Sequence, residues 1–245
     1  MKHALTIDHL ALQIGTKTLL DDVSFVIPEA ALFLILGPNG AGKTILLRCL
    51  AGLLKPTAGH VEIHEKAMAW VPLSQILPFG FRVRELVLMG RYAQHQGFAQ
   101  DRDRLATDES LRRVGITALA DRTYNSLSRG EQTKVDIARA LASDAHLILL
   151  DEPFSNLDID STLQMIVLFR ALRAEGRTLV LSHHDLYSVS ELATHALFLK
   201  KGQVLNTGPI AEVFQAPAIE AAYNVKAIFH EADKFVRFES LGRPD

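Results

Sequence analysis

The sequence predicts an α/β fold whose core is a mixed sheet, and three continuous apolar runs carry this prediction. The runs at residues 31–36, 146–150 and 177–182 have the length of strands and no polar alternation. A glycine-rich loop and a helix follow the first run, and the apolar, helical residues 163–174 join the other two. Continuous apolar strands connected by helices are typical of parallel strands covered on both faces.

The residues before the first apolar run predict a small antiparallel β subdomain at the N-terminus. Residues 5–14 and 23–27 alternate apolar with polar side chains, which is typical of half-buried strands. Turn residues at 15–17 and 21–22 separate these segments. We therefore expect short antiparallel strands that lead into the core.

A helical insert interrupts the core in the middle third of the chain. Two more strands are expected at residues 61–63 and 68–71, and apolar residues then recur at helical spacing from 83 to 141. There is no internal repeat, so we expect one domain over residues 1–245. Its parts are a core of about 1–79 and 143–225, a helical subdomain of about 80–142 and a C-terminal tail of about 226–245.

Composition excludes several classes of protein. Of the 245 residues, 48% are apolar and 22% are charged, and the net charge of −2 argues against nucleic acid as a partner. The single cysteine, Cys49, rules out a disulfide framework within the chain. No apolar run reaches the roughly 20 residues that cross a bilayer, and the N-terminus lacks a secretory signal. We therefore expect a cytoplasmic protein.

Residues 37–44 match the pattern G-x-x-x-x-G-K-[ST] between an expected strand and an expected helix. Glycines let the backbone approach a phosphate closely, and the helix N-terminus adds positive potential. Lys43 is expected to reach the β- and γ-phosphates, and the Thr44 hydroxyl to bind Mg²⁺. The cofactor-binding residues expected here are Gly37, Pro38, Asn39, Gly40, Ala41, Gly42, Lys43 and Thr44.

Two adjacent carboxylates, Asp151 and Glu152, follow the apolar strand that ends at Leu150. Open parallel sheets bind ligands at this edge. Asp151 suits the coordination sphere of Mg²⁺, and Glu152 suits a general base for the water that attacks the γ-phosphate. Such a pair could also start a loop or cap a helix, but the glycine loop favours the catalytic interpretation.

Residues 127–132 precede a helix, and Ser128 with Glu131 has the spacing of a capping box. Taken with the other motifs, however, this segment resembles the LSGGQ signature of the ATP-binding cassette (ABC) ATPases, except at Arg129 and Glu131. The resemblance covers about residues 5–208. It implies a P-loop NTPase core, ATP and Mg²⁺ as cofactors, and a homodimer in which Ser128 and Gly130 serve the ATP bound to the partner chain.

Two further segments are similar to motifs of that family. Residues 155–158 look like its D-loop, which lies at the dimer interface. His184 matches the switch histidine because Asp185 follows it directly, and His183 is the alternate candidate. The resemblance implies that His184 contacts the γ-phosphate and holds the attacking water in line with Glu152.

Several positions depart from the family pattern. Ile14 stands where an aromatic residue usually stacks on adenine, so apolar recognition with little preference for ATP over GTP is expected. Ile45 replaces a hydroxyl residue that contacts the α-phosphate. Leu73 occupies the place of the family's glutamine, and a leucine cannot ligate Mg²⁺. We expect Gln75, two residues later, to be the catalytic and metal-side glutamine.

Residues 83–92 resemble the VxELVxxGR stretch of ATPase subunits that serve importers of iron–siderophore complexes, haem, cobalamin and metal chelates. Packing explains the Val and Leu spacing but not the Gly90-Arg91 ending. Residues 202–214 and 222–225 are similar to the C-termini of that group.

This resemblance implies integral-membrane permease subunits as partners, a periplasmic or surface substrate-binding protein as an indirect partner, and a peripheral location on the inner face of the cell membrane. The alternatives are a soluble non-transport ABC ATPase and an ATP-binding regulator.

Overall fold

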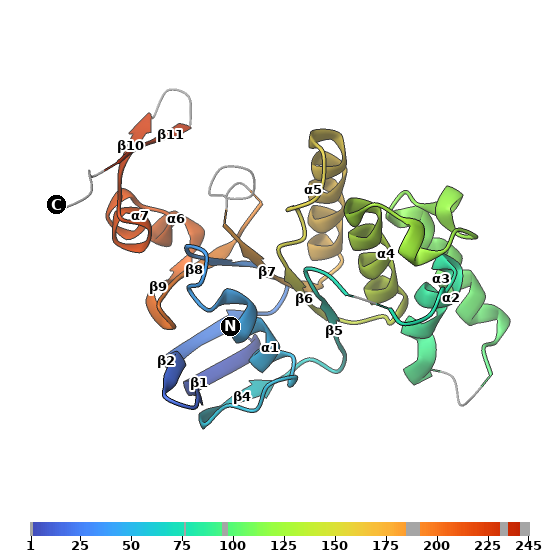
Figure 1. Ribbon diagram of the computed structural model, residues 1–245, viewed down its shortest axis with the longest axis horizontal. Coiled ribbons are helices and arrows are strands. Elements are labelled where there is room, and N and C mark those ends of the chain that lie inside the picture. Colours follow the sequence, from blue (N-terminus) through green and yellow to red (C-terminus); the bar gives the residue numbers. More distant parts are fainter. Residues whose placement is uncertain (1, 76, 95–97, 185–191, 231–234, 241–245) are drawn as a thin grey trace. The chain divides into compact units, whose positions relative to one another are not determined.

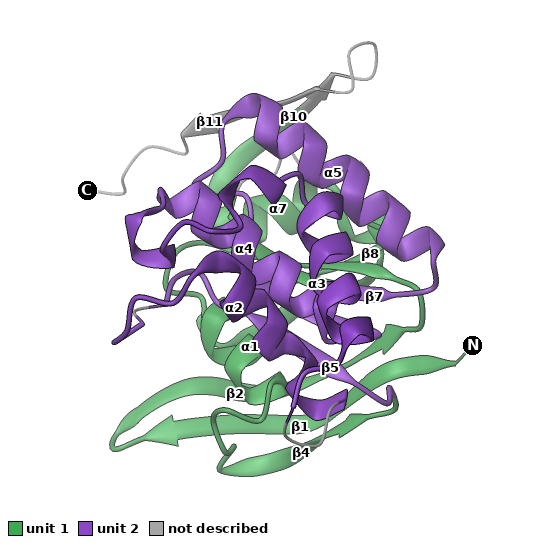
Figure 2. Cartoon of the chain, turned by 90° about the vertical axis from the view of Figure 1, so that its right-hand side faces the viewer, with its two compact units in different colours: residues 1–64, 180–245 green, residues 65–179 purple. Residues whose placement is uncertain are grey.

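The computed structural model describes residues 2–75, 77–94, 98–184, 192–230 and 235–240. The chain forms two compact units, which Figure 2 shows in different colours. Unit 1 contains residues 1–64 and 180–245, and unit 2 contains residues 65–179. Among the described residues, no helix combines the length and apolar character that a membrane span requires.

An antiparallel sheet forms the N-terminal part of unit 1, as the alternating pattern predicts. Its strands are β1 (His3–Ile14), β2 (Lys17–Pro28) and β4 (Ala58–Ile63), in the order β2-β1-β4 (Figure 1). The second strand begins six residues earlier than the expected start at residue 23. Asp22, with φ of 51°, lies in an irregularity of the ladder between the pairs Leu10–Val23 and Leu12–Leu20, so the strand continues through the expected turn.

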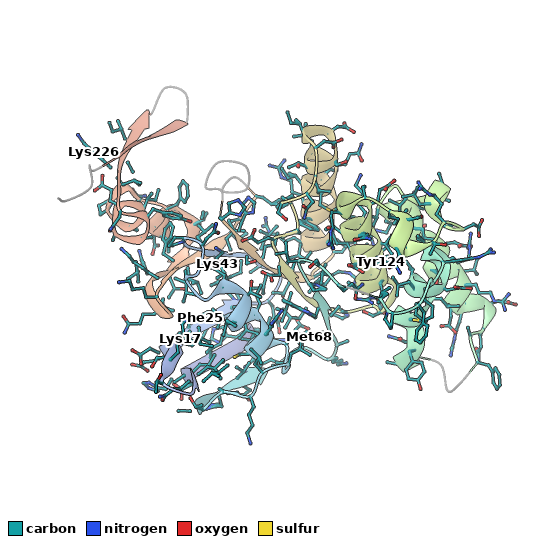
Figure 3. All side chains as sticks on the ribbon, viewed as in Figure 1. Lys17, Phe25, Lys43, Met68, Tyr124 and Lys226 are labelled. Carbon is teal, nitrogen blue, oxygen red and sulfur yellow. The ribbon has the colours of Figure 1, made fainter. Side chains whose placement is uncertain are left out.

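The core of unit 1 is built on β3 (Leu32–Leu36), in which every residue is buried. Strand β8 (His195–Lys200) pairs with β3 in parallel, and β9 (Gln203–Pro209) pairs with β8 antiparallel. The ring of Phe25, which Figure 3 labels, stacks on Phe33 with centroids 5.6 Å apart. Helix α1 (Lys43–Leu50) begins at the end of the glycine loop.

Strands β3, β8 and β9 belong to a six-stranded sheet, whose strand order is β5-β6-β7-β3-β8-β9. Strand β5 (Met68–Val71) pairs with β6 (Leu147–Asp151) in parallel, and β7 (Thr178–His183) is buried throughout. Parallel and antiparallel pairs both occur, so the prediction of a mixed sheet is confirmed.

Helices make up most of the rest of unit 2, which confirms the predicted helical insert. They are α2 (Val83–Leu88), α3 (Asp101–Arg113), α4 (Arg129–Ala142) and α5 (Ile159–Ala174), with short 3₁₀ segments η1 (Met89–Gln94), η2 (Thr117–Leu119) and η3 (Tyr124–Ser126). Helices α2 and α3 both pack against α4. A buried charged residue on α4, Asp136, is important for the candidate site.

The C-terminal part of unit 1 contains two helices and a hairpin. Helix α6 (Ile210–Val213) and helix α7 (Ala216–Tyr223) follow β9, and strands β10 (Val225–His230) and β11 (Phe235–Ser240) pair antiparallel. Asn224 follows the last residue of α7, and its φ of 57° lies in the left-handed region that stops a helix.

Candidate nucleotide site

The loop of residues 37–44 joins β3 to α1 in unit 1, as the motif predicts. Its backbone requires glycine at both ends of the glycine-rich stretch. Gly37 has φ of 152°, and a Cβ there would lie 2.1 Å from the Leu199 carbonyl oxygen. Gly42, immediately before α1, has φ of 108°. A side chain at either position would strain or displace the loop.

The ammonium of Lys43 is folded back across this loop. Lys43 is 6% exposed, and its Nζ donates to the Gly37 carbonyl at 2.8 Å and to the Pro38 carbonyl at 3.3 Å. Figure 3 labels this side chain at the first residue of α1. The first turn of α1 contains no acidic residue, so its positive end is not neutralised by a carboxylate of its own. The loop thus combines a cation, a helix N-terminus and glycine backbone, which suits a phosphate group.

The two carboxylates predicted at a strand end are found at the end of β6 in unit 2. Asp151 is the last residue of the strand and is 3% exposed. Glu152 has φ of 47°, which is unusual for a residue with a side chain, and this turns the chain sharply after the strand. The Glu152 carbonyl accepts from the Ser155 N–H at 3.1 Å. Strained backbone of this kind occurs at functional sites more often than elsewhere.

Ser128 caps α4, so the capping-box interpretation of this segment is confirmed. The Ser128 Oγ accepts from the Glu131 N–H at 3.3 Å and donates to the Glu131 carboxylate at 2.9 Å, while the Ser128 N–H donates to the same carboxylate at 2.8 Å. These bonds hold the pKa of Glu131 below its usual range, with the backbone bond from Ser128 as the main cause. The box fixes the serine hydroxyl at the helix entrance.

Gly130 packs against the segment of residues 155–158 within unit 2. A Cβ at Gly130 would lie 2.6 Å from the Asn156 carbonyl oxygen. Asp158 in turn caps α5 by accepting from the Ser161 N–H at 2.7 Å. The two motifs that resemble the family signature and the D-loop are therefore neighbours in this chain.

Gln75 lies in the segment between β5 and α2 of unit 2, where its amide meets a buried acid on α4. Its Nε2 donates to Oδ1 of Asp136 at 2.5 Å, and the Tyr124 phenol donates to Oδ2 of Asp136 at 3.0 Å. Asp136 is 2% exposed, and burial raises the pKa of its carboxyl to about 6. Tyr124, labelled in Figure 3, is also buried, and burial raises the pKa of its phenol. Leu73 is half exposed.

Asp136 and Tyr124 are residues that the sequence analysis missed. One signal was available, because Asp136 interrupts the apolar run of Val135, Ile137 and Ala138 on α4. Burial of a charged residue in such a run costs free energy unless the residue has a hydrogen-bond or ion-pair partner within the protein. Nothing local in the sequence identifies Gln75, 61 residues away, as its partner.

The two histidines at the end of β7 differ in their surroundings. His183 is the last residue of the strand and is buried, whereas His184 follows the strand and is exposed. Their ring centroids are 5.4 Å apart. An exposed imidazole is accessible to a ligand, which favours His184 over His183. Asp185, on which the alignment with the switch histidine depends, lies outside the described residues.

The Gly90-Arg91 ending has a packing role, so the expectation that packing does not explain it is wrong. A Cβ at Gly90 would lie 2.3 Å from the Arg139 carbonyl oxygen on α4. Arg91 donates to the buried Asp103 carboxylate at 3.2 Å and to the Ala142 carbonyl at the end of α4 at 3.0 Å. The pair therefore fastens η1 to α3 and α4, a contact that no short-range pattern indicates.

Comparisons with known proteins agree with these features. A family model described as "ABC transporter" matches residues 20–155. The zinc transport system ATP-binding protein TroB of Treponema pallidum is 34% identical over 232 residues, which cover 90% of this chain and 87% of TroB. The iron(3+)-hydroxamate import ATP-binding protein FhuC of Bacillus subtilis is 31% identical over 240 residues, which cover 92% and 89% of the two chains.

A solved structure of a metal-chelate type ABC transporter in an inward-facing conformation is similar over 99% of both chains, with a TM-score of 0.85 and 27% identity. The family model matches more than half of the chain, and the relatives are aligned over nearly the full length of both proteins. The chain therefore belongs to the ABC transporter family and is an ATPase subunit, similar to ATP-binding proteins of zinc and iron(3+)-hydroxamate transport systems.

Proposed function

We propose that this protein couples the binding and hydrolysis of Mg-ATP to the uptake of an iron–siderophore complex, haem, cobalamin or another metal chelate. The observation that carries the proposal is the loop of residues 37–44, which places a buried lysine and an uncapped helix N-terminus around glycine backbone. The cargo class is supported by the names of the relatives, which concern zinc and iron(3+)-hydroxamate.

In the proposed site, the backbone of residues 37–44 and the Lys43 ammonium bind the triphosphate. Thr44, Asp151 and the Gln75 side-chain oxygen would hold Mg²⁺. Across the described ranges, no three His, Cys, Asp or Glu side chains are grouped to hold a metal ion by themselves. This donor set still fits Mg²⁺, which usually takes one or two carboxylates together with phosphate oxygens and water. The bond from Gln75 to Asp136 uses the amide nitrogen, so metal binding would use the other end of the amide.

Hydrolysis requires a base and a group that orients the attacking water. We assign the base to Glu152, whose position directly after β6 and left-handed backbone support this role. His184 contacts the γ-phosphate and keeps the water in line, and its exposure supports this assignment over His183. Mg²⁺ held by the residues named above would supply charge neutralisation at the phosphate oxygens.

Dimerisation completes the site in this proposal. Ser128 and Gly130 of one copy bind the ATP held by residues 37–44 of a second copy. The Ser128 hydroxyl then exchanges its bond to the Glu131 carboxylate for a bond to the phosphate.

We further propose that the permease subunits bind the ATPase on the inner face of the membrane. A substrate-binding protein delivers the cargo to these permease subunits from the opposite face. The helical subdomain of about 80–142 is the proposed insert in the core.

The proposal is tested with Glu152→Gln and the matched exposed control Glu29→Gln. Loss of the base lowers kcat by about 10²- to 10⁴-fold while ATP still binds. Size-exclusion chromatography with light scattering should then show that the Glu152→Gln variant is a dimer with ATP and a monomer without it. The control should hydrolyse ATP at the normal rate. The proposed mechanism is contradicted if the Glu152→Gln variant stays monomeric in the presence of ATP, or if its kcat is normal.

The transport role has a separate test. The tagged protein should co-purify from membranes with polytopic subunits, and metal-chelate uptake should stop in cells that carry Glu152→Gln. Recovery of the protein without any polytopic subunit, together with normal uptake in those cells, contradicts the importer role and favours a non-transport ABC ATPase.

A further inference from the structure

We propose that Tyr223 is a positioning residue for nucleotide binding, because its phenol holds the first residue of the phosphate loop. The Gly37 N–H donates to the Tyr223 phenol oxygen at 3.0 Å, across 186 residues of sequence. Both residues belong to unit 1, and Tyr223 is the last residue of α7. This inference rests on the proposed role of residues 37–44 and adds a residue that the family signatures within that loop do not include.

Gly37 is fixed by three contacts, and Tyr223 supplies one of them. A Cβ at Gly37 would lie 2.1 Å from the Leu199 carbonyl oxygen, so no side chain fits there. Its own carbonyl accepts from the Lys43 ammonium at 2.8 Å, and its N–H binds Tyr223. Because Gly37 is buried, loss of that partner would leave its N–H without an acceptor and away from water, which costs free energy. The phenol is therefore linked to the Lys43 ammonium through a single residue.

The phenol is held in place by the end of α7. The ring of Tyr223 meets the fully buried ring of Phe198 edge to face, with centroids 6.2 Å apart. The Lys200 ammonium donates to the Ala221 carbonyl and to the side-chain oxygen of Asn224, which terminates the helix. The phenol thus projects from an anchored helix end.

This arrangement preorganises the loop for its ligand. Tyr223 contacts backbone at the start of the loop and is not needed to touch the nucleotide. Losing the phenol oxygen should allow Gly37 and the Lys43 ammonium to leave their positions before the nucleotide arrives. Binding of ATP and ADP then weakens equally, since both use the loop, while the turnover of saturated enzyme stays the same.

The test is Tyr223→Phe in the full-length protein, which removes one oxygen and retains the ring contact with Phe198. We expect KM for ATP and Kd for a fluorescent ADP analogue to rise about tenfold, with kcat within about twofold of the normal value. If Tyr223 had a purely structural role, the substitution would lower thermal stability without raising KM selectively over kcat. Unchanged KM and Kd would overturn the inference.

A matched variant on the same helix separates the phenol from general packing of α7. The Glu220 carboxylate accepts from the Ala227 N–H at 2.9 Å and does not reach the loop. Glu220→Ala should loosen the helix end and leave nucleotide affinity normal. An equal rise of KM in Glu220→Ala would assign the effect to packing and would refute the specific role of the phenol.

Amide exchange gives a second readout that does not depend on activity. With glycine labelled by ¹⁵N, the Gly37 amide should be protected in the normal protein and exchange faster in Tyr223→Phe. Equal exchange rates would contradict the inference even if affinity changed. Lys43→Met distinguishes the two proposals: if it binds nucleotide normally, the proposed site fails, whereas normal binding by Tyr223→Phe alone removes only the role of Tyr223.

Discussion

The two compact units prepare their functional residues in different ways. In unit 1, the candidate phosphate site is mainly backbone, and it depends on the absence of side chains at Gly37 and Gly42. In unit 2, the candidate residues are side chains held by other side chains, such as Ser128 by Glu131 and Gln75 by Asp136. A backbone site should therefore be most sensitive to an added methyl group. A side-chain site should be most sensitive to the loss of a partner.

The largest effect is expected for Gly37→Ala. The new Cβ would lie 2.1 Å from the Leu199 carbonyl oxygen, and φ of 152° is unfavourable for any residue with a side chain. We expect a loss of about 4 kcal/mol in the free energy of unfolding, together with loss of nucleotide binding. Urea unfolding and ADP titration measure both quantities.

Gly15→Ala is the matched control for this substitution. Gly15 has φ of 60°, but its Cβ would meet nothing within 4 Å. It should therefore cost only about 1 kcal/mol, the penalty for left-handed backbone. Equal losses for the two variants would mean that the contact with Leu199 does not constrain the loop.

The second effect, in unit 2, is expected for Asp136→Ala. This substitution leaves the Tyr124 phenol and the Gln75 amide without their acceptor in a buried place. We expect a loss of about 3 kcal/mol, and a smaller loss for Asp136→Asn, which keeps one carbonyl acceptor. Urea unfolding of both variants checks the order. If Asp136→Asn cost as much as Asp136→Ala, the carboxylate charge would matter more than the hydrogen bonds.

The same contrast explains what the sequence could predict. Residues 37–44 are contiguous, and the chemistry of each follows from its place in the loop, so the motif and its strand–loop–helix context were readable. The long-range partners were not. The bond between Gln75 and Asp136 forms only because the loop after β5 packs on α4, and Arg91 meets Ala142 only because η1 packs on α4. No spacing in the sequence encodes either contact. The early start of β2 was missed because an irregular ladder absorbs Asp22, which resembles a turn residue.

A third, smaller effect is expected at the entrance of α4. Ser128→Ala removes the cap that accepts from the Glu131 N–H, at a cost of about 1 kcal/mol. Asp158→Ala, at the start of α5, removes a cap of the same kind and should cost a similar amount. In the proposed dimer, only Ser128→Ala should also raise KM for ATP. A similar rise of KM in Asp158→Ala would place the signature and the 155–158 segment in one functional element.

The smallest effect concerns the dependence of stability on pH at Glu131. Because the Ser128 bonds lower the pKa of this carboxyl in the folded chain, the unfolded chain binds more protons in the window between the lowered and the ordinary pKa. Stability from this group is thus complete above the ordinary pKa and is lost as the pH falls through the lowered one. Glu131→Gln should reduce stability at pH 7 by less than about 1 kcal/mol, and the difference should vanish in acid. Urea midpoints of the unsubstituted protein and of Glu131→Gln, at about pH 7 and about pH 3, measure this difference in stability. A constant difference across that range would show that the capping box works through its hydrogen-bond geometry and owes nothing to the charge of the carboxylate.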